Sequence, residues 1–223
     1  MEPLSPFSPL KPFPEEKAEK ILEYAKKLGA HAVKEIIDTI RDLFGHPEAI
    51  RDRVNAWGYQ AKTGIAQSVE SITASRSDLT AYWEGGAFDS YKLYVDHLEE
   101  VFDNARNVFG QMADHLQAMA EAMTNFYNRL LTYVNHCYAT IISCTGGILA
   151  TIKEALIGIA EPIADAIAKF VEDSNDVITE MNMTIYQYNA AGQDIKQSIA
   201  DLKVPETIPS SSVDPGGWKV RAR

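Results

Sequence analysis

Apolar residues recur at steps of three and four along most of the chain, which is the period of amphipathic helices. Over residues 15–44 this period predicts a first helix, which Gly45 ends. A second helix is predicted over residues 47–82, because Pro47 suits the first positions of a helix. Arg76 is the one polar interruption of its stripe. The apolar members of that stripe are Val54, Trp57, Ala61, Ile65, Val69, Ile72, Leu79 and Trp83.

A third predicted helix begins near Phe88 and carries the longest regular stripe, which reaches Tyr133. Its steps alternate between three and four residues, and this repeat is typical of the seam of a left-handed coiled pair. The second and third helices are therefore predicted to form a hairpin over residues 48–133. The hairpin interface is expected to include Phe88, Tyr91, Leu98, Phe102 and Phe109. The carboxylates Glu99, Glu100 and Asp103 are predicted on the solvated face opposite the seam.

Residues 133–152 contain no charged side chain, and Gly146 and Gly147 predict a second turn within this run. A fourth helix is predicted over residues 148–202. Proline predicts a flexible, extended arm over residues 1–13, and the composition of residues 205–223 predicts a disordered tail. The fold class is thus all-α: residues 14–204 form an antiparallel helical bundle built on a long helix–turn–helix hairpin, with additional N- and C-terminal helices.

Charge and cysteine content limit the partners and the cellular compartment that we expect for this chain. The 223 residues carry a net charge of −10, and basic residues gather only in the terminal sequence WKVRAR, so no nucleic-acid partner is predicted. On one helix, Cys137 and Cys144 would lie about 10 Å apart, which is too far for a disulfide. They are interpreted as free, buried thiols. The proline-rich N-terminal sequence does not match a Sec-type signal peptide.

The titratable residues form no recognisable active site. None of the five histidines has a second histidine three or four residues away, which excludes the helical metal-binding motif; they are His31, His46, His97, His115 and His136. The chain also lacks a nucleophile elbow and a phosphate-binding glycine loop. We therefore predict no catalytic residue, no cofactor and no metal, and a function that is not enzymatic.

The sequence AYWEGGAFDSY, residues 81–91, separates the two helices of the predicted hairpin. Gly85 and Gly86 suit a chain reversal, and Trp83 carries a large apolar surface that needs cover. A Trp-x-Gly turn between two long amphipathic helices resembles the WXG family of helical hairpins exported by type VII (ESX) secretion systems. Trp83, Glu84 and Gly85 match its motif, and the resemblance covers residues 48–130, somewhat over a third of the chain.

The resemblance implies a non-enzymatic secretion substrate or partner protein, with Trp83, Gly85 and Gly86 as the turn motif. It implies pairing with a helical partner protein or with a second copy, contact with the type VII machinery, and folding in the cytoplasm before export to the medium or cell surface. Exported members of the family often carry Y-x-x-x-D/E after the second helix. No tyrosine of this chain fits that pattern, so a partner subunit or a divergent system would have to supply the signal.

Two further questions stay open at the level of sequence. Trp83 can be a packing residue of the hairpin, or its turn can also contact a secretion ATPase or partner. For the whole chain, one alternative is an α-helical pore-forming or membrane-acting protein with a concealed apolar hairpin near residues 133–160. The polar residues within the uncharged run argue against insertion, because each carries a cost in hydrocarbon. Another alternative is an intracellular helical scaffold.

Overall fold

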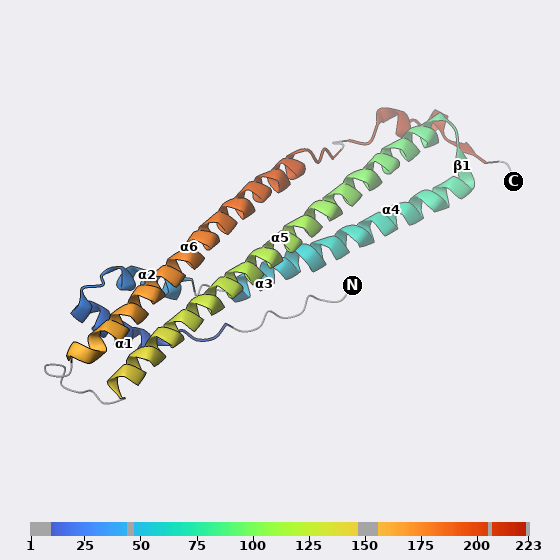
Figure 1. Cartoon of the computed structure of the whole chain (residues 1–223). Helices are drawn as coiled ribbons and strands as arrows, with labels where there is room; N and C mark the ends of the chain where they lie inside the picture. Colours follow the sequence, from blue (N-terminus) through green and yellow to red (C-terminus); the bar gives the residue numbers. More distant parts are fainter. Residues whose placement is uncertain (1–9, 44–46, 147–155, 205–206, 222–223) are drawn as a thin grey trace. The chain divides into compact units, whose positions relative to one another are not determined.

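The computed structural model describes residues 10–43, 47–146, 156–204 and 207–221 (Figure 1). Helices dominate these residues, which confirms the predicted all-α class. The helices are α1 Glu15–Leu28, α2 Ala32–Asp42, α3 Pro47–Asn55, α4 Lys62–Tyr82, α5 Gly86–Thr145 and α6 Leu156–Ala200, with a π-helical segment η1 Ala56–Ala61 between α3 and α4. The remaining elements are short: strands β1 Trp83–Glu84 and β2 Lys219–Val220, and 3₁₀ turns η2 Ser210–Ser212 and η3 Pro215–Gly217.

The chain divides into two compact units. Of the described residues, the first unit comprises 50–117, 189–204 and 207–221, and the second comprises 10–43, 47–49, 118–146 and 156–188. The long helices α5 and α6 each contribute to both units. The sequence predicted one bundle over residues 14–204, and the contacts of the chain instead group into these two units.

The predicted first helix is wrong in one respect, because two helices occupy its residues. Gly29 has φ +74 and ends α1. The Ala30 N–H donates to the Ala25 carbonyl at 2.9 Å, which is the long bond of a Schellman helix end. Apolar spacing resumes at Val33, so the break leaves little trace in the hydrophobic pattern. The predicted end at Gly45 lies outside the described residues.

The second unit holds a continuous apolar core, to which α1, α2, the C-terminal part of α5 and the N-terminal part of α6 contribute. Leu10 and Phe13 pack against this core, and the buried Tyr127 hydroxyl donates to the Lys11 carbonyl at 2.9 Å. Residues 10–13 of the predicted flexible arm are therefore held in place, because apolar side chains among the prolines find cover. Residues 1–9 lie outside the described part. The largest fully buried members are Tyr127, Ile21, Ile37, Ile40, Leu130 and Ile141.

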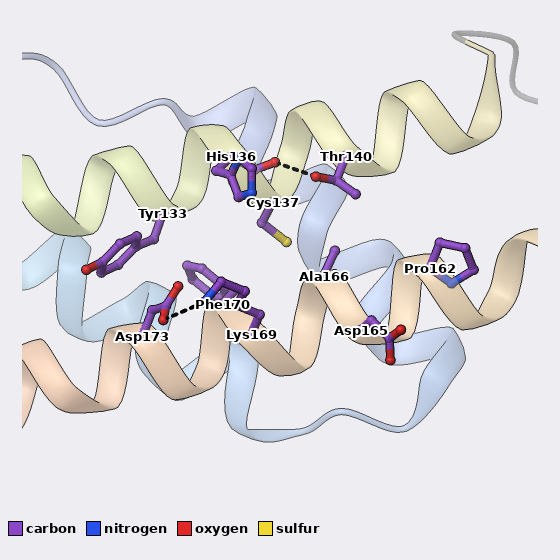
Figure 2. A pocket seen from close by; sticks show the side chains of 10 residues that line it. All are labelled: Tyr133, His136, Cys137, Thr140, Pro162, Asp165, Ala166, Lys169, Phe170 and Asp173. Carbon is purple, nitrogen blue, oxygen red and sulfur yellow. Dashed lines mark hydrogen bonds and ion pairs between the residues drawn. The ribbon is translucent and has the colours of Figure 1, made fainter.

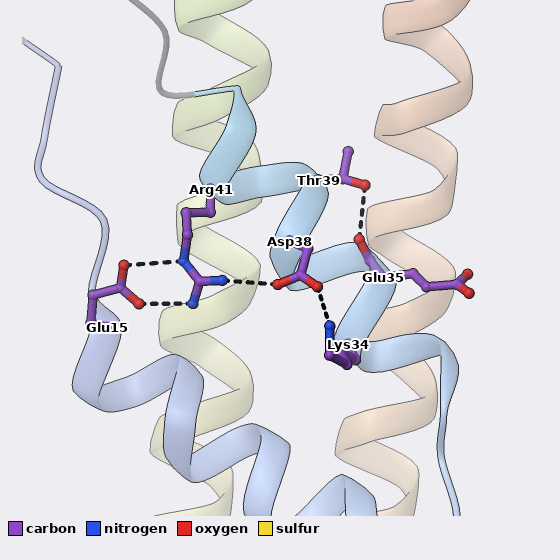
Figure 3. A network of polar contacts seen from close by, with 6 residues as sticks. All are labelled: Glu15, Lys34, Glu35, Asp38, Thr39 and Arg41. Atoms are coloured by element: carbon purple, nitrogen blue, oxygen red, sulfur yellow. Dashed lines mark hydrogen bonds and ion pairs between the residues drawn. The ribbon is translucent and has the colours of Figure 1, made fainter.

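A row of surface ion pairs joins the start of α1 to the end of α2 (Figure 3). The Arg41 guanidinium donates to both oxygens of Glu15, at 3.1 and 2.9 Å, and to Asp38 at 2.9 Å. Lys34 donates to the other oxygen of Asp38 at 2.6 Å. These bonds lower the pKa of the Glu15 and Asp38 carboxyls and raise the pKa of Arg41. Of these pairs, only Arg41–Glu15 crosses from α2 to α1, because Lys34, Asp38 and Arg41 all lie in α2, and its exposure keeps its energy small.

In the first unit, α4 and the N-terminal part of α5 form the predicted hairpin (Figure 1). Phe88 is buried as predicted, whereas Tyr91, Leu98, Phe102 and Phe109 are half-buried. Val95, Val101 and Val108 are buried as well, and the last two stand one residue before the predicted Phe102 and Phe109. At 3.6 residues per turn, a long helix drifts away from a 3.5-residue repeat, so buried positions shift by one along α5.

A polar contact crosses the hairpin at the predicted interruption Arg76. Its guanidinium donates to Asp96 and, at 3.0 Å, to Glu99, which also accepts from the Thr73 hydroxyl at 2.7 Å. The prediction that Glu99 belongs to the solvated face is wrong, because Arg76 draws it into the interface. Glu100 and Asp103 are exposed as predicted. The apolar seam is thus interrupted by one guanidinium and two carboxylates.

Candidate recognition site at the hairpin tip

The turn between α4 and α5 rests on one unusual backbone position. Trp83 leaves the helix in an extended conformation, with φ −123 and ψ 147. Gly85 has φ +104, a conformation that side chains with a Cβ rarely adopt, and its carbonyl accepts from the Asp89 N–H at 2.9 Å. Gly86 opens α5, and a Cβ there would meet no atom within 4 Å. Of the two predicted turn glycines, only Gly85 is therefore required by the turn.

The C-terminal segment of residues 207–221, here called the strap, lies on this turn (Figure 1). Its strand β2 pairs antiparallel with β1, so that Trp83 lies opposite Val220 and Glu84 opposite Lys219. The Arg221 N–H also donates to the Tyr82 carbonyl at 2.9 Å. The predicted disordered tail is wrong for these residues. Their composition supports no independent fold, but the hairpin tip supplies the partner that the strap lacks.

Three aromatic rings of the tip surround the Trp218 ring of the strap. Its centroid lies 5.7 Å from that of Trp83, 5.9 Å from Phe88 and 6.0 Å from Tyr91. The contacts with Trp83 and Phe88 are edge-on, an arrangement that the charge distribution of aromatic rings favours. The half-buried Trp83 is thus covered by a second tryptophan from the far end of the chain. We call Trp83, Phe88 and Tyr91 the aromatic cup.

The strap approaches the turn so closely that two glycines are needed. A Cβ on Gly85 would lie 2.5 Å from the Gly217 carbonyl oxygen, and a Cβ on Gly217 would lie 2.7 Å from the Ala87 Cβ. Within the strap, the Asp214 carboxylate accepts from the Gly216 N–H at 3.0 Å. The Trp218 indole N–H donates to the Ser212 carbonyl at 2.9 Å. These bonds hold the turns of the strap in the conformation that it has on the tip.

Sequence reasoning found the cup but missed the strap residues Gly217 and Trp218. The strap sequence PGGW combines one tryptophan with two glycines, as WEGG in the turn does, but this local signal does not indicate which surface the strap contacts. Charge contributes little to the junction: the Arg221 Nε and a Glu84 carboxylate oxygen are 3.9 Å apart, and both side chains are about half exposed. The site is therefore a packing and backbone-pairing surface, which is suited to recognition.

A separate groove of about 340 Å³ lies in the second unit between α5 and α6 (Figure 2). Cys137 forms part of its wall, and burial raises the pKa of this thiol to about 12, which disfavours a nucleophilic thiolate. Lys169 is paired with Asp173 at 3.1 Å. Among the described residues, no group of three or more metal-ligating side chains comes together. We therefore assign no chemistry to this groove.

Both cysteines are free, as predicted, but only Cys137 is fully buried, while Cys144 is half-buried.

The uncharged run of residues 133–152 was considered above as a possible membrane segment. Its residues 133–145 belong to α5, Gly146 follows with φ +64, and residues 147–152 lie outside the described part. Over the described part of the chain, none of the helices combines the length and apolar character that a membrane span needs.

Comparisons with protein-family models, with curated proteins and with solved structures found no match to this chain. The resemblance to the WXG family therefore rests on the Trp-x-Gly turn and its two flanking helices.

Proposed function

We propose that the chain is a non-enzymatic substrate or partner protein of a type VII secretion system, and that its hairpin tip is the recognition element. The observation that carries the proposal is the turn itself. Trp83 stands immediately after α4, Gly85 reverses the chain with a positive φ, and Phe88 begins the buried seam of α5. Trp83 is only half-buried beside Trp218, so part of this aromatic turn remains accessible for a partner to recognise.

The long face of α4 supports the pairing part of the proposal. None of its side chains, all of which lie in the described part, is fully buried. Its apolar residues Ile65, Val69, Ile72 and Leu79 are half-buried. A helix whose apolar stripe is incompletely covered by its own chain can bury more of it against another helix. The partner in this proposal is a helical protein or a second copy, met in the cytoplasm before export without a Sec signal.

Export of the Trp83→Ala chain tests the proposal in a bacterium that has a type VII system and carries the genes neighbouring this one. Most of the variant should stay in the cells, while the unchanged chain appears in the medium. Trp57→Ala is the matched control, because Trp57 is also half-buried in the first unit but stacks on Phe109 away from the tip, at 5.3 Å. This control should be exported.

The strap needs its own control, because replacing Trp83 also removes a contact of Trp218. The Trp218→Ala chain keeps the turn and should still be exported. Circular dichroism must show that each variant remains helical. Normal export of a folded Trp83→Ala chain, or equal loss of export in the Trp57 and Trp83 variants, would contradict the proposal. Leakage of liposomes caused by the unchanged chain would favour the membrane-acting alternative instead.

A further inference from the structure

The strap contacts the hairpin tip in the way that a bound peptide contacts a receptor. One side chain, Trp218, is inserted against the cup, and a short stretch of backbone pairs with β1. The apolar side chains of Val213 and Val220 are 62% and 72% exposed. The attachment of the strap to the hairpin tip therefore depends on few residues. An anchoring side chain combined with strand addition is a known mode of peptide recognition.

The geometry defines what this surface accepts. The residue at the Gly217 position must lack a Cβ, because a Cβ there would lie 2.7 Å from the Ala87 Cβ and 3.0 Å from the Ala87 backbone nitrogen. The next residue must offer an aromatic edge to three rings, as Trp218 does. Lys219 follows it and lies opposite Glu84 in the strand pair, where an exposed pair of opposite charges adds a small preference for a basic residue. The fitting ligand is thus an extended Gly-Trp-basic segment.

The strap is connected to α6 in a way that permits exchange. Between Ala200 and Ser210, the described residues 201–204 and 207–209 form no helix or strand. Val204 before the strap and Ile208 at its start are 58% and 51% exposed, so neither side chain ties this stretch to the surface. Exchange of an identical element between copies requires a connection of this kind and leaves every contact of the element unchanged.

We propose that the hairpin tip is a peptide-binding site, that the strap occupies it within one chain, and that the strap of a second copy occupies it when the two chains exchange straps. The second copy is the chosen occupant because its strap is identical to the segment already seated on the cup. Within one chain the covalent connection gives the strap an effective concentration of roughly millimolar, so exchange becomes visible when the chain's own strap is weakened.

Binding of a labelled synthetic peptide of residues 207–221 to the purified full-length chain tests whether the hairpin tip is a peptide-binding site. The Trp218→Ala chain has an intact cup and a weakened strap, so it should bind the peptide at least about tenfold more tightly than the unchanged chain does. A peptide with Gly217→Ala should not bind, because its Cβ would meet Ala87. A peptide with Gly216→Ala is the matched control and should bind, because a Cβ there meets only Asp214 Oδ1, at 3.5 Å.

A mixture of two variants tests the second part. Trp83→Ala damages the cup but keeps the strap, and Trp218→Ala does the reverse. Sedimentation should show a two-chain complex in the mixture that neither variant forms alone. If the peptides with Gly216→Ala and Gly217→Ala bind equally, or none binds, the peptide-binding site is refuted. If the mixture forms no complex beyond those of the separate variants, strap exchange is refuted. Neither result depends on export, so this inference and the proposed function fail separately.

Discussion

At the scale of single residues, the two glycines of the turn look equivalent in the sequence but have different surroundings. Gly85 combines a positive φ with a close approach to the strap, whereas Gly86 has ordinary helical surroundings. Gly85→Ala should therefore lower the free energy of unfolding by about 1 kcal/mol or more, since alanine is strained at positive φ. Gly86→Ala should leave it unchanged or raise it slightly. Urea denaturation measures both, and equal effects would show that the turn does not depend on Gly85.

The two thiols give a second residue-scale prediction. Burial raises the pKa of Cys137 to about 12, so its thiolate is scarce at pH 8, while Cys144 is half-buried. In the native chain a thiol reagent should modify Cys144 first, and Cys137 only after denaturant is added. A raised folded pKa also means that Cys137 favours the folded state less as the pH rises above the ordinary thiol pKa of about 8.5.

The Cys144→Ser chain isolates the Cys137 signal in this experiment, and the Cys137→Ser chain isolates that of Cys144. Stability of the Cys144→Ser chain should fall between pH 8 and 10 by more than that of a chain lacking both thiols, because the unfolded state then loses the Cys137 proton first. Rapid native modification of Cys137 would show that the core around α5 opens readily.

What the sequence could reveal at this scale depends on distance along the chain. Gly85 could be found because turn chemistry is local: a glycine pair between two helical patterns indicates a reversal by itself. Trp218 could not be assigned, because its role depends on rings contributed by residues 83–91, far away in sequence. Local composition therefore predicted disorder for a segment whose order comes entirely from a distant surface.

At the scale of elements, helix type was predictable and helix ends were less so. The three-four period identified α4, α5 and most of α6, since a long amphipathic stripe has few other interpretations. The same period hid the break at Gly29, because Ile21, Ala25, Val33 and Ile36 all face one core from two helices. The predicted buried positions in the middle of α5 were wrong by one residue for a related reason. Sequence spacing alone does not determine how far a long helix of 3.6 residues per turn departs from a strict 3.5-residue repeat.

The ion pair between α1 and α2 gives a prediction that distinguishes the loss of a paired charge, at Glu15, from the loss of an unpaired surface charge, at Glu16. Glu15→Gln removes the partner of Arg41 from α1 and leaves Asp38, its partner within α2, so it should lower the melting temperature slightly, and high salt should reduce the difference. Glu16→Gln is the matched control, since Glu16 is exposed in the same helical turn and has no ion pair within the described part of the chain. This control should have little effect.

The pH dependence of the Glu15 effect follows from the direction of its shift. The hydrogen bond from Arg41 lowers the folded pKa of Glu15, so its contribution is present above the ordinary carboxyl pKa and disappears as the pH falls through the lowered value. The Glu15→Gln chain and the unchanged chain should therefore melt alike in strong acid. Identical melting of the Glu15→Gln and Glu16→Gln chains near pH 7 would mean that the Arg41 pair contributes nothing.

At the scale of the whole molecule, the two units differ in how completely they bury their helices. The second unit has a continuous core with large side chains such as Ile21, Tyr127 and Leu130. In the first unit the buried residues of the hairpin are mostly valine and alanine, and α4 has none that is fully buried. Regions with little buried apolar surface open at lower free energy than well-packed cores. The hairpin is thus the part of the molecule whose stability a bound partner can raise most.

Hydrogen exchange followed by mass spectrometry tests this difference. In the isolated chain, amides of α4 should exchange faster than those of α2 and of residues 126–141 in α5, although all are helical. A partner that pairs with the hairpin should slow exchange in α4 and leave α2 unchanged, because binding stabilises only the part that it covers. The Val108→Ala chain is a useful control: it should speed exchange in α4 without changing α2, since Val108 belongs to the first unit. If α4 is as protected as α2 before any partner is added, the hairpin is complete by itself and the pairing proposal loses its physical basis.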